Sequence, residues 1–308
     1  MLNGIGALGF AVPALILVGL SWTLTGVVMS DAPRKKLDPA LILLLSGLVG
    51  LCINVTILSM QVNRLPALRV WLLAGGCYFI SSGLNFLMLQ VMSYAMQRGP
   101  NGVIWSLIQS ALVFPFLTGV LFYGSAFTII RCVGLVLVLL ALVLLGAAKE
   151  NQVKSQGWKK PTFLAFLMTG LILSLNTIPS YYPELQKLPS VARTLCGGTG
   201  ALLVGGIWNL RKYCANTPEQ WLHLIKNPHI WKYILMLQCF GLLASYLLLY
   251  PGLDAMAKAG AGCISYPLIV GSCIIGFNLY SMLKLREKCT LLQVGGVLCC
   301  VAGLALLI

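Results

Sequence analysis

Hydrophobic residues occur along this chain in long runs that are separated by short polar segments. A helix needs about 20 mostly apolar residues to cross the hydrocarbon of a bilayer, and the runs have this length. Backbone groups in lipid need hydrogen-bond partners within their own segment, so each run is predicted to be a helix. The predicted spans are 9–30, 39–60, 68–92, 101–123, 128–147, 161–182, 189–208, 231–251, 259–281 and 291–308. The pattern therefore predicts an all-α membrane protein with ten transmembrane helices.

The composition supports the membrane assignment. Of the 308 residues, 59% are hydrophobic and 9% are charged, whereas a soluble domain carries about 25% charged residues. The apolar excess must therefore face lipid. The eleven cysteines lack metal-ligand spacing and lie mostly inside apolar runs, so we interpret them as packing residues. We expect neither a metal nor a cofactor.

The formal net charge of +14 comes from Lys and Arg in the short segments between the apolar runs. Basic residues there meet anionic headgroups, so the lipid bilayer is the predicted partner of this charge and nucleic acid is not. The segments after spans one, three, five, seven and nine hold fifteen of the 21 Lys and Arg residues, and the alternate segments hold six. The positive-inside rule then predicts both termini on the non-cytoplasmic side of an inner (plasma) membrane.

The two halves of the chain resemble each other. Ala95-Met96-Gln97-Arg98 opens the fourth span and Ala255-Met256-Ala257-Lys258 opens the ninth, and a glycine follows each motif. The aliphatic end of the fifth span likewise corresponds to the end of the tenth. Self-similarity of this kind indicates an internal repeat.

The repeat divides the chain into residues 1–148, a polar connecting loop at 149–160, and residues 161–308. Each half has five predicted helices, and an odd number means that the second half enters the membrane upside down relative to the first. Such inverted repeats are typical of secondary transporters, in which two similar halves enclose a cavity near the middle of the bilayer.

The repeat unit resembles the EamA-like repeat of the drug/metabolite transporter superfamily. The resemblance in the first half runs from Gly75 through Pro115 and Gly124 to Leu145, and in the second half it includes Tyr266-Pro267, Glu287 and Gln293-Val294-Gly295-Gly296. The first half departs from the family pattern, with Ser125 and Arg131 where glutamate and glutamine are expected. Parts of the first half also resemble the branch of rhamnose and glucose permeases. The resemblance implies a transporter, and coupling to a proton or another ion is implied by it alone.

Polar and aromatic residues inside spans are the candidate substrate ligands, because such residues usually face the bundle interior or a water-filled cavity. Tyr78, Ser82 and Asn85 are spaced by four and three residues, so they share one helix face. Each residue could instead form a helix–helix hydrogen bond that fixes packing. The predicted substrate-binding residues are Tyr78, Ser82, Asn85, Trp105, Gln109, Asn176, Thr177, Tyr181, Tyr246 and Tyr266.

Four ionisable residues near span ends are candidates for gating or coupling: Glu184, Arg193, Asp254 and Lys258. Glu184 and Arg193 could form a pair that closes a gate or binds a charged group of the substrate, or both could lie solvated at the headgroup boundary. No acidic residue lies in the middle of a predicted span.

The sequence therefore predicts a secondary active transporter that moves a small polar metabolite, with a sugar-like solute favoured, by alternating access through a central cavity. Export of amino acids, nucleoside-type metabolites or drugs fits the same fold, and a non-transporting membrane scaffold or sensor is an alternative of another class. An enzyme is not expected, because the two histidines, His223 and His229, lie in one loop apart from other candidate ligands. The pattern leaves open whether the protein is a monomer or a homodimer.

Overall fold

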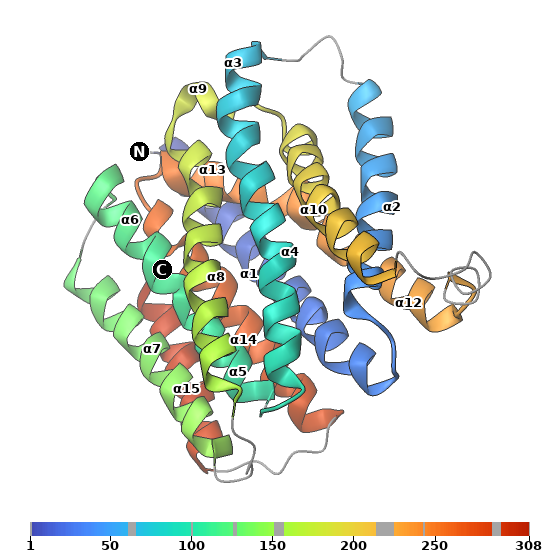
Figure 1. Ribbon diagram of the computed structural model, residues 1–308. Coiled ribbons are helices and arrows are strands. Elements are labelled where there is room, and N and C mark those ends of the chain that lie inside the picture. The colour runs from blue at the N-terminus through green and yellow to red at the C-terminus, as the bar shows by residue number, and fades with distance from the viewer. Residues whose placement is uncertain are drawn as a thin grey trace.

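The computed structural model describes residues 2–60, 66–99, 101–125, 128–150, 157–213, 225–242, 244–284 and 291–307. Within these ranges the secondary structure consists of helices and turns. Figure 1 shows the helices packed side by side as one bundle, with the long helices crossing it in alternate directions. Among the residues named above, His223 and Glu287 lie outside the described residues.

The first half of the bundle contains seven α-helices and two short segments of other helical type within the described residues. The α-helices are α1 (Leu2–Arg34), α2 (Pro39–Ser59), α3 (Leu68–Val70), α4 (Gly76–Met96), α5 (Asn101–Gln109), α6 (Val113–Tyr123) and α7 (Ile129–Glu150). The π-helical η2 (Trp71–Gly75) joins α3 to α4, and the 3-10 helix η3 (Ser110–Leu112) joins α5 to α6.

The second half follows the same plan. Its α-helices are α8 (Lys159–Tyr181), α9 (Pro183–Gln186), α10 (Ser190–Tyr213), α12 (Pro228–Met236), α13 (Tyr250–Lys258), α14 (Ser265–Leu283) and α15 (Leu291–Leu307). The π-helical η4 (Leu237–Leu242) and η5 (Ser245–Leu249) lie between α12 and α13, and the 3-10 helix η6 (Gly262–Ile264) precedes α14.

The ten predicted ranges overlap these helical segments, with boundaries that differ by up to seven residues, as at the start of α1 and the end of α13. In the described part of the chain, seven helices are long and apolar enough to cross a membrane, and two shorter apolar helices lie at 129–144 and 294–307. The all-α membrane class is therefore confirmed, whereas ten spans in two inverted halves stay a prediction. The Ala-Met-x-basic motifs differ from expectation in one respect, since they end α4 and α13 and do not begin the helices that follow.

Two prolines break their helices in the same way in the two halves. Pro115 is the third residue of α6 and follows the 3-10 turn η3, and Pro267 is the third residue of α14 and follows the 3-10 turn η6. Proline cannot donate to the carbonyl four residues earlier and its ring collides with it, so the preceding turn departs from α-helical geometry.

The main helix contacts form matched pairs. Helix α1 packs along α14, and α8, the first helix of the second half, packs along α5 and α6. Helix α4 packs on α8, while α1 packs on η4, η5 and α13. The remaining long helices pair across the halves, α2 with α10 and α7 with α15. Most of the packing therefore lies between the halves.

The two ends of the bundle differ in charge. The end that we call the basic end is where α1, α4 and α10 end and α8 begins, and its segments carry most of the Lys and Arg residues. The opposite end, which we call the α9 end and which lies at the top of Figure 1, is where α8 and α13 end and α10 begins. Buried apolar side chains form a cluster at each end, one around Phe116, Leu253 and Met256 at the α9 end and one around Met29 and Met92 at the basic end.

Glycines allow the backbones of α7 and α15 to approach each other closely. A Cβ atom on Gly303 would lie 2.7 Å from the Gly134 carbonyl oxygen, and one on Gly134 would lie 2.8 Å from the Gly303 carbonyl oxygen. Small residues at such positions let transmembrane helices pack by van der Waals contact.

Gly303→Ala is expected to destabilise the protein by about 1–3 kcal/mol, because the added methyl group forces α15 away from α7. Gly295 on the same helix has nothing within 4 Å of its Cβ position, so Gly295→Ala is the matched control and is expected to leave stability unchanged or slightly raised. Thermal unfolding of both variants in detergent tests this, and equal melting temperatures would contradict the packing argument.

Candidate substrate cavity and ion-pair network

A cavity of about 230 Å³ lies in the middle of the bundle, between the two apolar clusters. Its wall comes from α1, α4, α5, α8, η5 and α13, so both halves contribute to it. The lining residues are Trp22, Thr25, Ser81, Ser82, Asn85, Met88, Leu89, Met92, Trp105, Ile108, Gln109, Thr169, Ile172, Leu173, Asn176, Ser245, Leu249 and Tyr250.

The wall combines hydrogen-bonding groups with flat aromatic surfaces. The Ser81 hydroxyl donates to the Asn176 side-chain oxygen at 2.6 Å, which holds that amide in the wall. The Trp105 ring is stacked on Phe277 with centroids 5.1 Å apart. The Trp105 indole nitrogen and the Thr169 hydroxyl are buried without a hydrogen-bond partner in the described residues. Unpartnered polar groups beside a cavity are places where a ligand or water can bind.

A second cavity, of about 290 Å³, adjoins the first and extends between α2, α10 and η4. The two share Ser82, Asn85, Leu89, Ser245 and Tyr250 in their walls. The π-helical segments η4 and η5 supply part of this region, and π-helical turns inside α-helices are frequent at functional sites. Neither wall contains an Asp, Glu, Lys, Arg or His residue from the described part of the chain.

The structure brings five of the ten predicted substrate-binding residues together around the first cavity. These five are Ser82, Asn85, Trp105, Gln109 and Asn176.

The other five residues have different surroundings. Tyr78 and Tyr266 are fully buried against aromatic neighbours, with ring centroids 5.0 Å from Tyr250 and 6.2 Å from Trp22 respectively. The Thr177 hydroxyl donates to the carbonyl oxygen of the preceding turn at 2.7 Å. Tyr181 stacks on Tyr123 at 4.1 Å near the α9 end. Tyr246 is half-buried and lies outside the wall of both cavities.

Sequence reasoning missed several wall residues, among them Trp22, Thr25, Thr169 and Tyr250. Trp22 and Thr25 are three residues apart on α1 and so share a face, a spacing that could have marked them as candidates. Thr169 has no comparable signal, because a single threonine in an apolar run is more often a packing residue.

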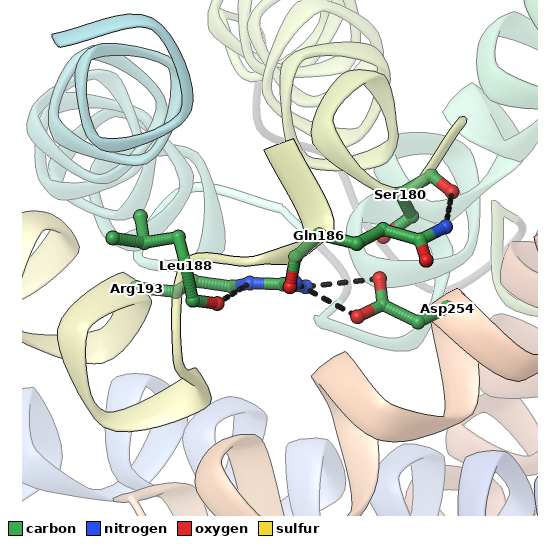
Figure 2. A network of polar contacts seen from close by, with 5 residues as sticks. All are labelled: Ser180, Gln186, Leu188, Arg193 and Asp254. Carbon is green, nitrogen blue, oxygen red and sulfur yellow. Dashed lines mark hydrogen bonds and ion pairs between the residues drawn. The ribbon is translucent and has the colours of Figure 1, made fainter. Parts of the chain in front are cut away.

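An ion pair between Arg193 and Asp254 lies at the α9 end (Figure 2). The two terminal nitrogens of Arg193 donate to the two carboxylate oxygens of Asp254 at 2.9 and 2.8 Å. Arg193 also donates from its Nε to the Leu188 carbonyl oxygen and from Nη2 to the Gln186 carbonyl oxygen, both at 2.9 Å. Gln186 in turn donates to the Ser180 carbonyl oxygen at 2.6 Å. The network therefore ties the end of α8, the segment around α9, the start of α10 and α13 to one another.

The ion pair reaches the cavity through two tyrosines. The guanidinium carbon of Arg193 lies 6.0 Å from the Tyr78 ring centroid and 5.6 Å from the Tyr250 ring centroid. Tyr250 lines both cavities. A cation at this distance from an aromatic ring is attracted by it, so Arg193 attracts both rings, and Tyr250 connects the ion pair to the cavity wall.

Two expectations about the ionisable residues need correction. Arg193 is 1% exposed and pairs with Asp254, so it is neither solvated at the headgroup boundary nor paired with Glu184. Glu184 is exposed and pairs with Lys187 at 2.8 Å, because the two are three residues apart along α9 and its C-cap. Lys258 is exposed at the end of α13.

A different set of contacts lies at the basic end. The Tyr233 hydroxyl of α12 donates to the Asp31 carboxylate of α1, and Lys35 pairs with the same carboxylate at 2.9 Å. Contact with the Tyr233 hydroxyl and with Asp31 raises the pKa of Lys35 above its ordinary value, so Lys35 stays charged at neutral pH. The cavity thus lies between two sets of contacts. Helix α1 contacts α12 at the basic end, and α10 contacts α13 at the α9 end.

The first half of the chain matches a known family of membrane proteins. The family model described as the EamA-like transporter family matches residues 9–147, which cover nearly all of the first predicted five-helix half. This match confirms the resemblance to the drug/metabolite transporter superfamily. Together with the seven helices that are long and apolar enough to cross a membrane, it supports a multi-pass membrane protein whose first half is similar to a transporter family.

Comparison with other proteins adds the fold of the whole chain. A solved structure described as a crystal structure of a protein superposes on this one with a TM-score of 0.65, over 95% of each chain and at 16% sequence identity. The two therefore share a fold from end to end. No curated protein matches the sequence.

Asp254→Asn is expected to destabilise the protein by about 3–5 kcal/mol, because it leaves the buried Arg193 charge without its counter-ion. Glu184→Gln removes a carboxylate of the same charge from an exposed pair and is expected to cost about 0–1 kcal/mol. Thermal unfolding followed by tryptophan fluorescence compares the two variants. Equal losses of stability would show that the buried network does not hold the α9 end together.

Proposed function

We propose that this chain, which carries an EamA-like transporter unit in residues 9–147, moves a small uncharged polar solute across a bilayer by alternating access. The observation that carries the proposal is the central cavity, whose wall in the described part of the chain is polar, aromatic and free of charged side chains and comes from both halves. A scaffold or sensor without transport activity needs no such cavity.

Two inverted five-helix repeats are the architecture that we propose for this mechanism. The matched helix pairs support it, since α1 on α14 corresponds to α8 on α5 and α6 when the halves are exchanged. The two proline-induced 3-10 turns support it too, because they occupy the same place in corresponding helices. Repeats related in this way can rock against each other around a site near the midplane.

A sugar-like solute suits the cavity best among the candidate substrates. Serine and threonine hydroxyls and the amides of Asn85, Gln109 and Asn176 can donate to and accept from hydroxyl groups. The Trp22 and Trp105 rings offer flat surfaces for one face of a ring. A charged ammonium or carboxylate group would lose its hydration there without gaining a counter-ion, which disfavours amino acids and cationic drugs. Nucleoside-type solutes are uncharged and remain the alternative.

The contacts at the two ends of the bundle are the proposed gates. Opening at the α9 end separates Arg193 from Asp254, and opening at the basic end separates Tyr233 from Asp31. Under the positive-inside rule the α9 end is the outer one, so both termini lie on the non-cytoplasmic side of an inner membrane. Glu184 and Lys258 lie near the outer gate but outside its ion pair, so we assign them no part in holding it closed.

A thermal-shift screen of the purified protein tests the proposed function directly. Neutral sugars or nucleosides are expected to raise the melting temperature, because a ligand that binds the folded state stabilises it by mass action. Amino acids and organic cations of similar size are expected to have no effect. Stabilisation by the charged compounds alone would contradict the proposed substrate class, and stabilisation by none of the compounds would contradict a metabolite site in the cavity.

Asn85→Leu is expected to weaken binding of the stabilising solute by about tenfold or more, because an apolar side chain of similar shape removes both its donor and its acceptor. Asn278→Leu is the matched control: Asn278 is buried on α14, donates to the Ile274 carbonyl oxygen at 2.9 Å and lies outside the cavity wall. Titration by isothermal calorimetry and uptake into proteoliposomes measure the effect. Equal losses in the two variants would place the site elsewhere.

A further inference from the structure

A groove of about 870 Å³ lies on the side of the bundle, apart from the central cavity. Its walls are the first part of α8 and the last part of α10, and the second half of α4 supplies Leu87 to Gln97 between them. The N-cap of α2 closes it at the basic end. Helices α8 and α10 both pack on α4, so the groove is a feature of the packed bundle and not of a single loop.

The uncharged hydrogen-bonding groups Gln90 and Ser93 of the groove lie on one face of α4. Ser93 is 3% exposed, and its hydroxyl has no hydrogen-bond partner in the described residues. The Gln90 side-chain nitrogen, one helical turn earlier, is buried and equally without a partner there. Gln97 continues the same row towards the basic end. Buried donors of this kind are normally satisfied by protein, water or a ligand, so the groove offers unmet donors to an oxygen-bearing molecule.

The other side chains that line the groove change in polarity along its length. The apolar side chains of Leu87, Leu164, Val204 and Ile207 lie nearer the middle of the bundle, where hydrocarbon surrounds the protein. Trp208 and Tyr94 come next, and aromatic residues of this type are enriched at the level of lipid headgroups.

The rim of the groove is basic. It contains Arg211 and Lys212, and Lys212 also pairs with Asp38 at 2.8 Å. The guanidinium carbon of Arg98 lies 3.4 Å from the centroid of the Tyr94 ring in the same wall, which adds positive charge beside the groove. The order along the groove is therefore hydrocarbon surface, aromatic and amide groups, and then positive charge.

We propose that this groove is a binding site for one anionic phospholipid. An acyl chain lies along Leu87, Val204 and Ile207, the ester and phosphate oxygens accept hydrogen bonds from Gln90 and Ser93, and the negative charge of the phosphate meets Arg211. The charge of the rim complements the anionic headgroup, and basic pockets between transmembrane helices are suited to such lipids. The proposal does not depend on the solute that the central cavity binds.

Native mass spectrometry of the delipidated full chain, with phosphatidylglycerol or phosphatidylcholine added, tests the site. The wild-type protein is expected to bind one phosphatidylglycerol more tightly than phosphatidylcholine. Arg211→Gln is expected to weaken phosphatidylglycerol binding about fivefold and phosphatidylcholine binding less, since the choline ammonium of phosphatidylcholine offsets the phosphate charge that Arg211 would meet. Ser93→Ala is expected to weaken both lipids, because both carry the ester and phosphate oxygens that its hydroxyl would bind.

Lys232→Gln is the matched control, because Lys232 is an exposed basic residue of α12 at the same end of the bundle but outside the groove. Equal binding of the two lipids by the wild-type protein would overturn the proposal. An equal loss of phosphatidylglycerol binding in Lys232→Gln and Arg211→Gln would also overturn the proposal, since that result would show diffuse attraction to a basic surface.

A dimer that forms without lipid and is lost in Ser93→Ala would show that a second copy of the chain occupies the groove instead. Thermal unfolding of each variant tests whether that variant is folded. If Arg211→Gln does not fold, the lipid binding of Ser93→Ala decides the outcome.

Discussion

The α9 end of this bundle depends on one interaction, the ion pair of the buried Arg193 with Asp254. A guanidinium that is 1% exposed inside a membrane protein must find an acceptor for its donors within the protein. Arg193 meets this requirement with Asp254 and with the carbonyl oxygens of Gln186 and Leu188. The segments that carry these groups can occupy few other relative positions without leaving a charge unpaired. The end of α8, the start of α10 and the end of α13 are therefore held in place by electrostatics as much as by apolar packing.

The same constraint has a different outcome at the cavity. The Arg193 guanidinium donates to Asp254 and to two carbonyl oxygens, whereas the Trp105 nitrogen and the Thr169 hydroxyl find no partner in the described residues. Both belong to the cavity wall, and the apolar clusters above and below that wall are buried. A polar wall with unmet hydrogen-bonding capacity, enclosed between two buried apolar clusters, is suited to a molecule that comes and goes.

The sequence was sufficient to predict the helices and insufficient to predict their partners. The length of an apolar run largely determines where a spanning helix begins and ends, and so 39–60 was expected and Pro39–Ser59 is observed. Spacing on one helix also sufficed to predict that Ser82 and Asn85 point to the same place. The partner of Arg193 lies 61 residues away, and Glu184 was the nearer carboxylate along the chain. Which of the two it meets depends on how α10 packs against α13, and that packing is a property of the whole bundle.

The chemistry of the two ends also bears on how the proposed rocking could proceed. At the α9 end, Arg193 and Asp254 lose their partners as the helices separate, and the charges are stable apart only if water reaches them. Opening at this end therefore has to admit water and break the ion pair in the same step, which makes partly open states unfavourable. The Tyr250 ring lines the cavity and lies 5.6 Å from the guanidinium carbon of Arg193, so a solute that displaces Tyr250 also changes the surroundings of the Arg193 charge. In the proposed mechanism, occupancy of the cavity and the state of the outer gate are thus linked through the Tyr250 ring, without an Asp, Glu, Lys, Arg or His residue in the described part of the cavity wall.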